Sequence, residues 1–237
     1  LGDVYKRQII EYNGMWLVSN FEKTQLPTGW GVEQQITCVD GSTFQMYMAN
    51  MKSIFMDMIK NTDMVIFNRC KKEDPLPTYR RGIKVANQRA EVIFEDEEGE
   101  LGDIFQDEMP FDMNAPVIEI LPEDYGIWFV DAMDHPENYE GKTVKFKARV
   151  MKPRGMGSKF FVPGRTAMTC CADDTTFLGY VCKSAYAPKL TPGEWVEVTA
   201  KVGIEKRNEY QGEEGIVLAA EHVEQCDPLE DEMVYFN

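Results

Sequence analysis

The feature that most constrains the fold is an alternation of short apolar runs and helical periodicity over residues 35–96. Three apolar runs predict strands, at 35–39, 64–67 and 90–94. Between the first two runs, apolar residues recur at helical spacing over 44–59, after Ser42 or Thr43 as the cap. A second helix is expected over 78–86. Strands that alternate with helices in this way form a parallel sheet with right-handed crossovers.

The second half of the chain has a different pattern. A helix is expected within 122–139, ended by Pro136. After this helix, apolar and polar residues alternate, which is typical of strands with one buried face. Six strands are predicted, at 143–150, 159–162, 167–171, 177–182, 195–202 and 215–220. Five or six short strands in succession fit a small barrel of the OB type, and a fragment of a β-sandwich is the alternative.

Composition divides the chain into five parts. These are an artefactual scar at 1–8, an α/β part at 9–98, an acidic linker at 99–120, a β domain at 121–226 and an acidic tail at 227–237. The first part, LGDVYKRQ, looks like the translation of an adaptor used in library preparation, so we exclude it from the fold prediction. On this interpretation the chain is N-terminally truncated, and its natural sequence begins at Ile9.

Charge and hydrophobicity exclude some classes of function. The formal net charge of −15 repels phosphate backbones, so we expect no nucleic-acid partner. No apolar run approaches the ~20 residues of a membrane-spanning helix, and no signal-peptide pattern is present. The six cysteines therefore indicate reduced thiols in a cytoplasmic protein rather than a disulfide framework.

A first series of motifs points to a nucleotide. Four segments follow one another along the chain: an apolar pair and Glu-Tyr-Asn-Gly over 9–14, ITCVD at 36–40, VIFNR at 65–69 and VANQRA at 85–90. We interpret Ile9 and Ile10 as the remnant of a strand that ends at Glu11. In a P-loop GTPase, an acidic residue at a strand end helps to position Mg²⁺, a glycine just beyond it donates its N–H to the γ-phosphate, and an Asn-Lys-x-Asp segment reads guanine.

In this order, the four segments resemble the CobW/HypB/UreG group of GTPases and metallochaperones, in particular its CobW-like branch, over residues 9–96. The resemblance implies the rear half of a parallel-sheet P-loop NTPase domain that uses GTP and Mg²⁺. It implies a role in the Mg²⁺ shell for Glu11, a γ-phosphate contact for Gly14 and a base contact for Asn68. The implied function is a metallochaperone or a regulator of metal homeostasis, with GTP hydrolysis in the intact protein.

Two features depart from this family's pattern. Lys71 stands where the guanine-reading aspartate is expected, and a lysine cannot accept the N–H donors of guanine, which leaves the identity of the base open. No G-x-x-x-x-G-K-[ST] occurs in the chain. The family's metal-binding cysteine motif would also lie upstream of Ile9. We therefore expect this fragment to be inactive alone.

A second series of motifs lies in the β domain. GRTAMTCCADD at 164–174, followed by Gly179 and Cys182, resembles the C-terminal domain of the YcgQ-like family, over residues 120–225. Members of that family are associated with a permease. The resemblance therefore implies a permease as a partner, together with the OB-type fold, whereas a metallochaperone would have a metal-receiving protein as its partner.

The cysteines of this motif are candidate zinc ligands. Cys170 and Cys171 are adjacent, so on a regular strand they point to opposite faces and share one ion only where the chain turns. The Ala-Asp-Asp that follows favours such a turn, and Cys182 would return on the next strand. Thiolates with Asp173 or Asp174 would suit zinc. The alternative is that one cysteine packs inside the barrel and the other has no role.

Two hypotheses of different classes follow. The first is a GTP-binding metallochaperone or regulator whose nucleotide site is split by the truncation. The second is a non-catalytic binding module, in which the α/β part is a scaffold and the barrel recognises a partner protein or a metal; Lys71 favours it. An oligonucleotide-binding OB domain is a third option, which the net charge disfavours.

Overall fold

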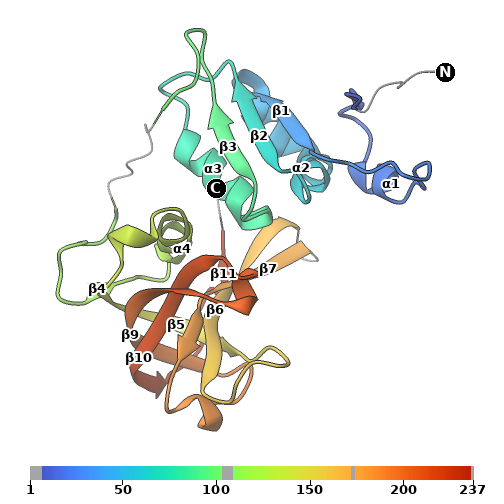
Figure 1. Cartoon of the computed structure of the whole chain (residues 1–237). Helices are drawn as coiled ribbons and strands as arrows, with labels where there is room; N and C mark the ends of the chain where they lie inside the picture. The colour runs from blue at the N-terminus through green and yellow to red at the C-terminus, as the bar shows by residue number, and fades with distance from the viewer. Residues whose placement is uncertain (1–6, 103–108, 172–173, 236–237) are drawn as a thin grey trace. The chain divides into compact units, whose positions relative to one another are not determined.

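The structure is a computed structural model that describes residues 7–102, 109–171 and 174–235 (Figure 1). The chain forms two compact units. The first comprises the residues up to Asp74 together with Arg89–Gly102, and the second comprises Pro75–Gln88 together with the residues from Asp103 onward. Each unit is described by itself below.

The first unit contains a small parallel sheet, as the sequence predicts. Its strands are β1 (Ile36–Asp40), β2 (Met64–Asn68) and β3 (Glu91–Phe94), and they lie side by side in the order β1-β2-β3. Helix α2 (Phe44–Ile59) connects β1 to β2. Helix α3 (Leu76–Ala86) connects β2 to β3 along the chain, but by its contacts it belongs to the second unit.

Aromatic rings hold α2 against this sheet. The ring of Phe44 lies 5.0 Å from that of Phe55 and 4.9 Å from that of Phe67, in edge-to-face contacts between ring centroids. Phe67 also stacks on Phe94 of β3, with 4.8 Å between centroids. All four side chains are buried. Edge-to-face and offset-stacked pairs are the favoured arrangements of aromatic side chains, so the apolar pattern of the sequence is enough to explain this core.

The start of α2 differs from the prediction. A short 3₁₀ turn, η1 (Gly41–Thr43), precedes the helix, and Asp40 caps it by accepting the backbone N–H of Ser42. Thr43 occupies the N-cap position of α2, as one of the two predicted alternatives, but its side chain makes no capping bond to the helix, and Ser42 lies inside the turn. An aspartate at the end of β1 satisfies the free N–H groups one turn earlier.

The strand predicted to end at Glu11 is also absent from the described residues. Residues 7–13 have no regular structure, and the first helix is α1 (Val18–Glu22). Ile9 is fully exposed, and Ile10 is exposed for 61% of its surface. A strand is stable when its backbone groups pair with a neighbour. In the described residues the apolar pair has no such partner, so the apolar pattern alone was not enough to predict a strand.

The second unit is a β domain with one well-buried helix. Its helices are α3, α4 (Tyr125–Asp134) and the short turns η2 (Pro136–Asn138), η3 (Ala187–Lys189) and η4 (Asn208–Tyr210). Its strands are β4 (Ile118–Glu119), β5 (Thr143–Met151), β6 (Phe160–Cys171), β7 (Asp174–Gly179), β8 (Val181–Lys183), β9 (Trp195–Lys206), β10 (Glu214–Gln225) and β11 (Met233–Val234).

Five of these strands close into a barrel. β6 pairs with β8, β8 runs parallel to β10, and β10 pairs with β9. β9 then pairs with β5, which returns to β6. If these five strands are numbered along the chain, β5 is the first, β6 the second, β8 the third, β9 the fourth and β10 the fifth. Around the barrel their order is 1-2-3-5-4, and the contact between the third and fifth strands is parallel. The barrel is therefore OB-like, as predicted, and the β-sandwich alternative is wrong.

Segments outside the five strands complete the core of this domain. Helix α4 buries Trp128 against Phe146 of β5, with 4.8 Å between ring centroids, and Phe129 stacks on Tyr180. Ile118 and Ile120, from the stretch predicted as a linker, are buried in the same core. From the stretch predicted as a tail, β11 pairs with β6. In the described part of the chain, no helix has the length and apolar character needed to cross a bilayer.

Candidate functional site

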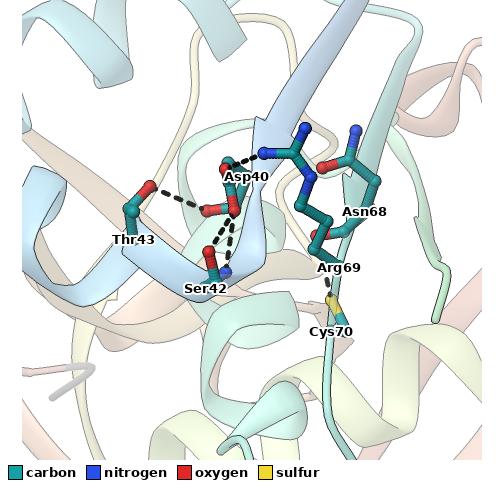
Figure 2. A network of polar contacts seen from close by, with 6 residues as sticks. All are labelled: Asp40, Ser42, Thr43, Asn68, Arg69 and Cys70. Carbon is teal, nitrogen blue, oxygen red and sulfur yellow. Dashed lines mark hydrogen bonds and ion pairs between the residues drawn. The ribbon is translucent and has the colours of Figure 1, made fainter. Parts of the chain in front are cut away.

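The carboxyl end of the parallel sheet brings several polar side chains together (Figure 2). β1 ends at Asp40 and β2 ends at Asn68, and these two residues are direct neighbours in the register of the sheet. Ligands of open α/β sheets bind outside the carboxyl ends of the strands. The predicted base-contacting residue, Asn68, therefore lies at the edge of the sheet where a nucleotide would be expected.

Asp40 is the centre of the network at this edge. One of its carboxylate oxygens accepts the hydroxyl of Ser42 at 2.6 Å and the N–H of Ser42 at 3.0 Å. The other carboxylate oxygen accepts Nη1 of Arg69 at 2.6 Å. The hydrogen bond from the Ser42 hydroxyl, assisted by Arg69, lowers the pKa of Asp40 below its ordinary value, and Asp40 is ionised at neutral pH. The start of α2 is thereby fixed to the end of β1.

Arg69 reaches Asp40 because of its backbone conformation. Its φ is 55°, in the left-handed region that residues other than glycine rarely adopt. Its side chain is 71% exposed, and that of Asp40 is 32% exposed. An ion pair this accessible contributes little to stability, so the guanidinium can leave the carboxylate at small cost. Arg69 is therefore a cation available to a ligand at the sheet edge.

Asn68 carries an unsatisfied polar atom. Its side-chain oxygen Oδ1 is buried and has no hydrogen-bond partner among the residues that the structure describes. Leaving a buried acceptor unpaired costs about 1–3 kcal/mol, and each such atom in a native protein needs an explanation. A ligand that donates an N–H to Asn68 would remove this cost.

Cys70 and Gly41 pack closely against each other beside this network. A Cβ atom at Gly41 would lie 2.8 Å from Sγ of Cys70 and 3.0 Å from the carbonyl oxygen of Asn68, so only glycine fits here. The backbone N–H of Cys70 donates to the carbonyl of Glu95 at 2.9 Å, which joins the ends of β2 and β3. Burial raises the pKa of Cys70 to about 11. Cys70 is therefore a protonated packing residue and not a nucleophile.

The other two residues predicted to bind the nucleotide, Glu11 and Gly14, make no hydrogen bond or ion pair with the described residues of this network. Glu11 and Gly14 are both exposed. The carbonyl of Gly14 accepts the hydroxyl of Tyr47 in α2 at 3.4 Å. The structure gives no hydrogen bond or ion pair between Glu11 and the network around Asp40. Their roles in binding Mg²⁺ and the γ-phosphate stay predictions.

Lys71 lies at the turn after β2 and is exposed. Its backbone N–H donates to the carboxylate of Asp74 at 2.8 Å, which closes the turn that follows β2. Neither Asp40 nor Arg69 was predicted to have a role in the site. The signal for Asp40 was an aspartate at the end of an apolar strand followed by Gly-Ser-Thr, which is a capping pattern. The sequence carries no signal for the left-handed backbone at Arg69.

In the β domain, one of the predicted zinc ligands can be placed. Cys182 is fully buried inside the barrel, and burial raises its pKa to about 12. The side chains of Cys170, Cys171, Asp173 and Asp174 lie outside the described residues. Within the described ranges, no group of three histidine, cysteine, aspartate or glutamate side chains could hold a metal. A buried thiol is a poor ligand until it ionises, so Cys182 does not by itself fit a zinc site.

The Gly-Arg pair that opens the cysteine motif has a structural role. The guanidinium of Arg165 is buried and donates to the carbonyl oxygens of Pro122, Asp231 and Met233, the last two at 3.0 Å. It also lies 5.6 Å from the ring centroid of Tyr125. Arg165 therefore ties β6 to the segment before α4 and to the C-terminal strand β11. No local sequence pattern predicts a buried arginine here.

Similarity to solved structures is low. The single-stranded DNA binding protein Rim1 of S. cerevisiae mitochondria matches with 10% identity and a TM-score of 0.23, over 37% of this chain and 97% of that one. The aspartyl tRNA synthetase of Entamoeba histolytica has 15% identity and a TM-score of 0.26, over 50% of this chain and 27% of that one. The corresponding protein of Leishmania major has 18% identity and a TM-score of 0.26, over 48% and 21%. These scores are too low to carry an argument about function.

Comparison with sequences is more informative. No curated protein shows significant similarity to this chain. The family model of the DUF1980 C-terminal domain matches residues 100–236, which is more than half of the chain. The match includes the closed barrel, α4 and β11, and it fits the predicted YcgQ-like C-terminal domain. By this match, the chain belongs to the DUF1980 C-terminal domain family.

Proposed function

We propose that the parallel sheet supplies the base-binding part of a nucleotide site in a GTPase-type metallochaperone or regulator of metal homeostasis. The observation that carries the proposal is the buried, unpaired oxygen of Asn68 at the carboxyl end of β2. Guanine and adenine both present amino N–H donors that an amide oxygen can accept. A bound base would satisfy the one polar atom of this network that the protein leaves unpaired.

The charges around Asn68 are compatible with a nucleotide and its metal. The ionised carboxylate of Asp40 is the kind of hard oxygen ligand that Mg²⁺ prefers. Arg69 is mostly exposed and could turn from Asp40 to a phosphate. In the proposal, Glu11 acts on the Mg²⁺ shell and Gly14 contacts the γ-phosphate, as the resemblance to CobW-like proteins implies.

The proposal does not specify the base. Lys71 stands where the family's guanine-reading aspartate is expected, so the structure offers no carboxylate at that position. The phosphate-binding loop is not among these 237 residues, because no G-x-x-x-x-G-K-[ST] occurs in them. We therefore expect this chain alone to bind nucleotides weakly and to hydrolyse none.

Two measurements test the proposal. First, the gene around this chain should encode a phosphate-binding loop on a strand-to-helix turn, and a complete gene without one would refute it. Second, binding of fluorescent GTP and ATP analogues to the gene's full product should weaken about ten-fold or more in Asn68→Ala. Asn61→Ala is the matched control, because the Asn61 side chain donates to Glu22 at 2.6 Å on the surface of the same unit. Equal affinities of the two variants would remove Asn68 from the site.

A second candidate function is a non-catalytic binding module. The observation that favours it is Lys71. A lysine cannot accept the N–H donors of guanine, and an α/β part that reads no base would serve as a scaffold. In this case the OB-like barrel recognises a partner protein, a permease or a metal such as zinc. A full gene product that binds neither GTP nor ATP, but retains its fold, would favour this candidate.

A further inference from the structure

The barrel has an open groove between two of its loops. The groove has a volume of about 630 Å³ and lies between the loop from β5 to β6 and the hairpin from β9 to β10. Its lining residues are Pro153, Arg154, Gly155, Met156 and Gly157 from the loop, and Lys206, Arg207, Asn208 and Glu209 from the hairpin. The two segments are more than 45 positions apart in the sequence, so only the closure of the barrel brings them together.

The position of the groove in the fold is informative. β5 and β6 are the first and second strands of the barrel, and β9 and β10 are the fourth and fifth (Figure 1). In OB folds, the loops between strands one and two and between strands four and five border the face that binds ligands. The groove therefore lies where this fold ordinarily holds a ligand.

The groove is basic in a chain that is strongly acidic. Three of its lining side chains are basic, Arg154, Lys206 and Arg207, and only Glu209 is acidic. The chain as a whole has a formal net charge of −15. Arg154 and Lys206 are both exposed, and among the described residues neither side chain makes an ion pair or a hydrogen bond. Glu214 faces Lys206 across the register of β9 and β10, so Arg154 is the more accessible of the two cations to an anionic partner.

One wall of the groove is rigid. The guanidinium of Arg207 lies 4.3 Å from the ring centroid of Phe160 and makes two hydrogen bonds to Glu209, at 3.0 and 3.2 Å. The Tyr210 hydroxyl accepts the backbone N–H of Val181 at 3.2 Å and donates to the carbonyl of Ile216. A wall fixed in this way loses little conformational entropy when a ligand binds.

The other wall, the loop from β5 to β6, has few side chains over its backbone, because two of its lining residues are glycines. Gly155 has a φ of 87°, a conformation that suits glycine, and Gly157 follows it two residues later. Without side chains at these positions, a ligand can approach the backbone of the loop closely. The N–H of Met156 is already donated to the carbonyl of Pro153 at 3.3 Å, so the basic side chains are the main feature of this wall that attracts an anion.

We propose that this groove binds a short acidic peptide segment of a partner protein, with Arg154 and Lys206 contacting its carboxylates. Complementary charge supplies the specificity and the rate of encounter. Peptide binding by the barrel does not depend on nucleotide binding by the parallel sheet. Loss of either activity would leave the other measurable.

The groove favours a peptide over a single-stranded nucleic acid for two reasons. Nucleic-acid grooves of this kind stack bases on open aromatic faces, whereas none of the lining residues is aromatic and Arg207 packs on the ring of Phe160. The hairpin also carries Glu205, Glu213 and Glu214, which are exposed and would repel any long run of negative charge, whether of phosphates or of carboxylates. A short segment with a few carboxylates avoids both difficulties.

The test is a fluorescence anisotropy titration of the whole 237-residue chain at low and moderate salt. The probe is a fluorescein-labelled peptide of alternating glutamate and glycine. Comparison probes of the same length are an alternating glutamine and glycine peptide and an oligothymidylate. We expect binding of the glutamate peptide alone, weakened by salt. The double variant Arg154→Glu/Lys206→Glu should weaken that binding about ten-fold or more.

The matched control is the double variant Lys189→Glu/Lys201→Glu. It makes the same change in net charge at two exposed lysines that do not line the groove, and its affinity should stay within about two-fold of the unmodified chain. Thermal melts of both variants verify that the barrel is folded. An equal loss in the control, tighter binding of the oligothymidylate, or no binding of the glutamate peptide at low salt would each overturn the proposal.

Discussion

Replacement of Gly164 by alanine tests how closely β6 and β7 approach one another. Gly164 faces Gly179 across the register of these two strands. A Cβ atom at Gly164 would lie 2.8 Å from Cζ of Phe177, and it would lie closer still to the carbonyl oxygen of Leu178. Real Cβ atoms essentially never approach other heavy atoms this closely, so the strands must separate to admit a methyl group.

The expected cost can be worked out from these neighbours. Overpacking of a well-packed core ordinarily costs about 1–3 kcal/mol. The obstacle at Gly164 is a backbone carbonyl and a ring rather than the end of a flexible side chain, so we expect the upper end of that range, about 3 kcal/mol. In a domain of this size, such a loss lowers Tm by roughly 10 °C.

Gly203→Ala in β9 is the control, because it makes the same substitution in another strand of the barrel. There the new Cβ atom would meet its nearest neighbour, the carbonyl oxygen of Val217, at an ordinary distance of 3.7 Å. Its free energy of unfolding should stay within about 0.5 kcal/mol of the unmodified chain. Urea unfolding and thermal melts, followed by circular dichroism, measure both variants. Equal stabilities of Gly164→Ala and Gly203→Ala would refute the close approach of β6 and β7.

Three further predictions concern buried and capping groups. Arg165→Met should lower the free energy of unfolding by about 3 kcal/mol, because three carbonyls lose a charged donor, and amide hydrogen exchange of the C-terminal strand should accelerate. Burial raises the pKa of Cys182 to about 12 and that of Cys70 to about 11, so at pH 8 mass spectrometry should find both unalkylated by iodoacetamide until urea unfolds the chain. In the unfolded chain these thiols ionise near pH 9.0. Their contribution to the free energy of unfolding should therefore be complete below that pH and should decline as the pH rises toward the pKa values of the folded protein. Urea melts at pH 8 and at higher pH measure this decline, and they would show no difference if the thiols were accessible. Asp40→Ala should cost about 1 kcal/mol through the lost cap, and Arg69→Ala less than that, because this ion pair is exposed. The pKa of Asp40 is lowered, so its contribution to the free energy of unfolding should be present above pH 3.8 and should disappear as the pH falls through the pKa of the folded protein. Urea melts at pH 7 should show a larger loss for Asp40→Ala than for Arg69→Ala, and melts at acidic pH should show this difference shrinking.

The polar network at the sheet edge was predictable in part. The place of Asn68 at the sheet edge followed from the apolar run that it ends, whereas its base contact was implied by the resemblance to CobW-like proteins. Its neighbour Asp40 could have been found by its capping pattern. The ion pair from Arg69 could not, since it depends on a left-handed backbone that sequence patterns do not predict for arginine.

The predicted strand at Ile9 and Ile10 shows where apolar pattern alone is insufficient. Two isoleucines before a Glu-x-x-Gly segment are compatible with a strand, yet the described residues provide no neighbouring strand to pair with them. Strand formation depends on hydrogen bonds to another segment, and the local sequence does not contain that information.

The sequence by itself determined the two kinds of architecture in this protein. Alternation of apolar runs with helical spacing specified the parallel sheet of β1, β2 and β3, and period-two alternation specified the strands of the barrel, because both signals are local. Tertiary structure decided how the barrel closes, through the pairing of β5 with β6 and of β8 with β10. The closure puts Arg165 inside the domain, gives Gly164 its close neighbours and forms the basic groove between two loops that are distant in sequence. These features depend on contacts between remote segments, which no local pattern specifies.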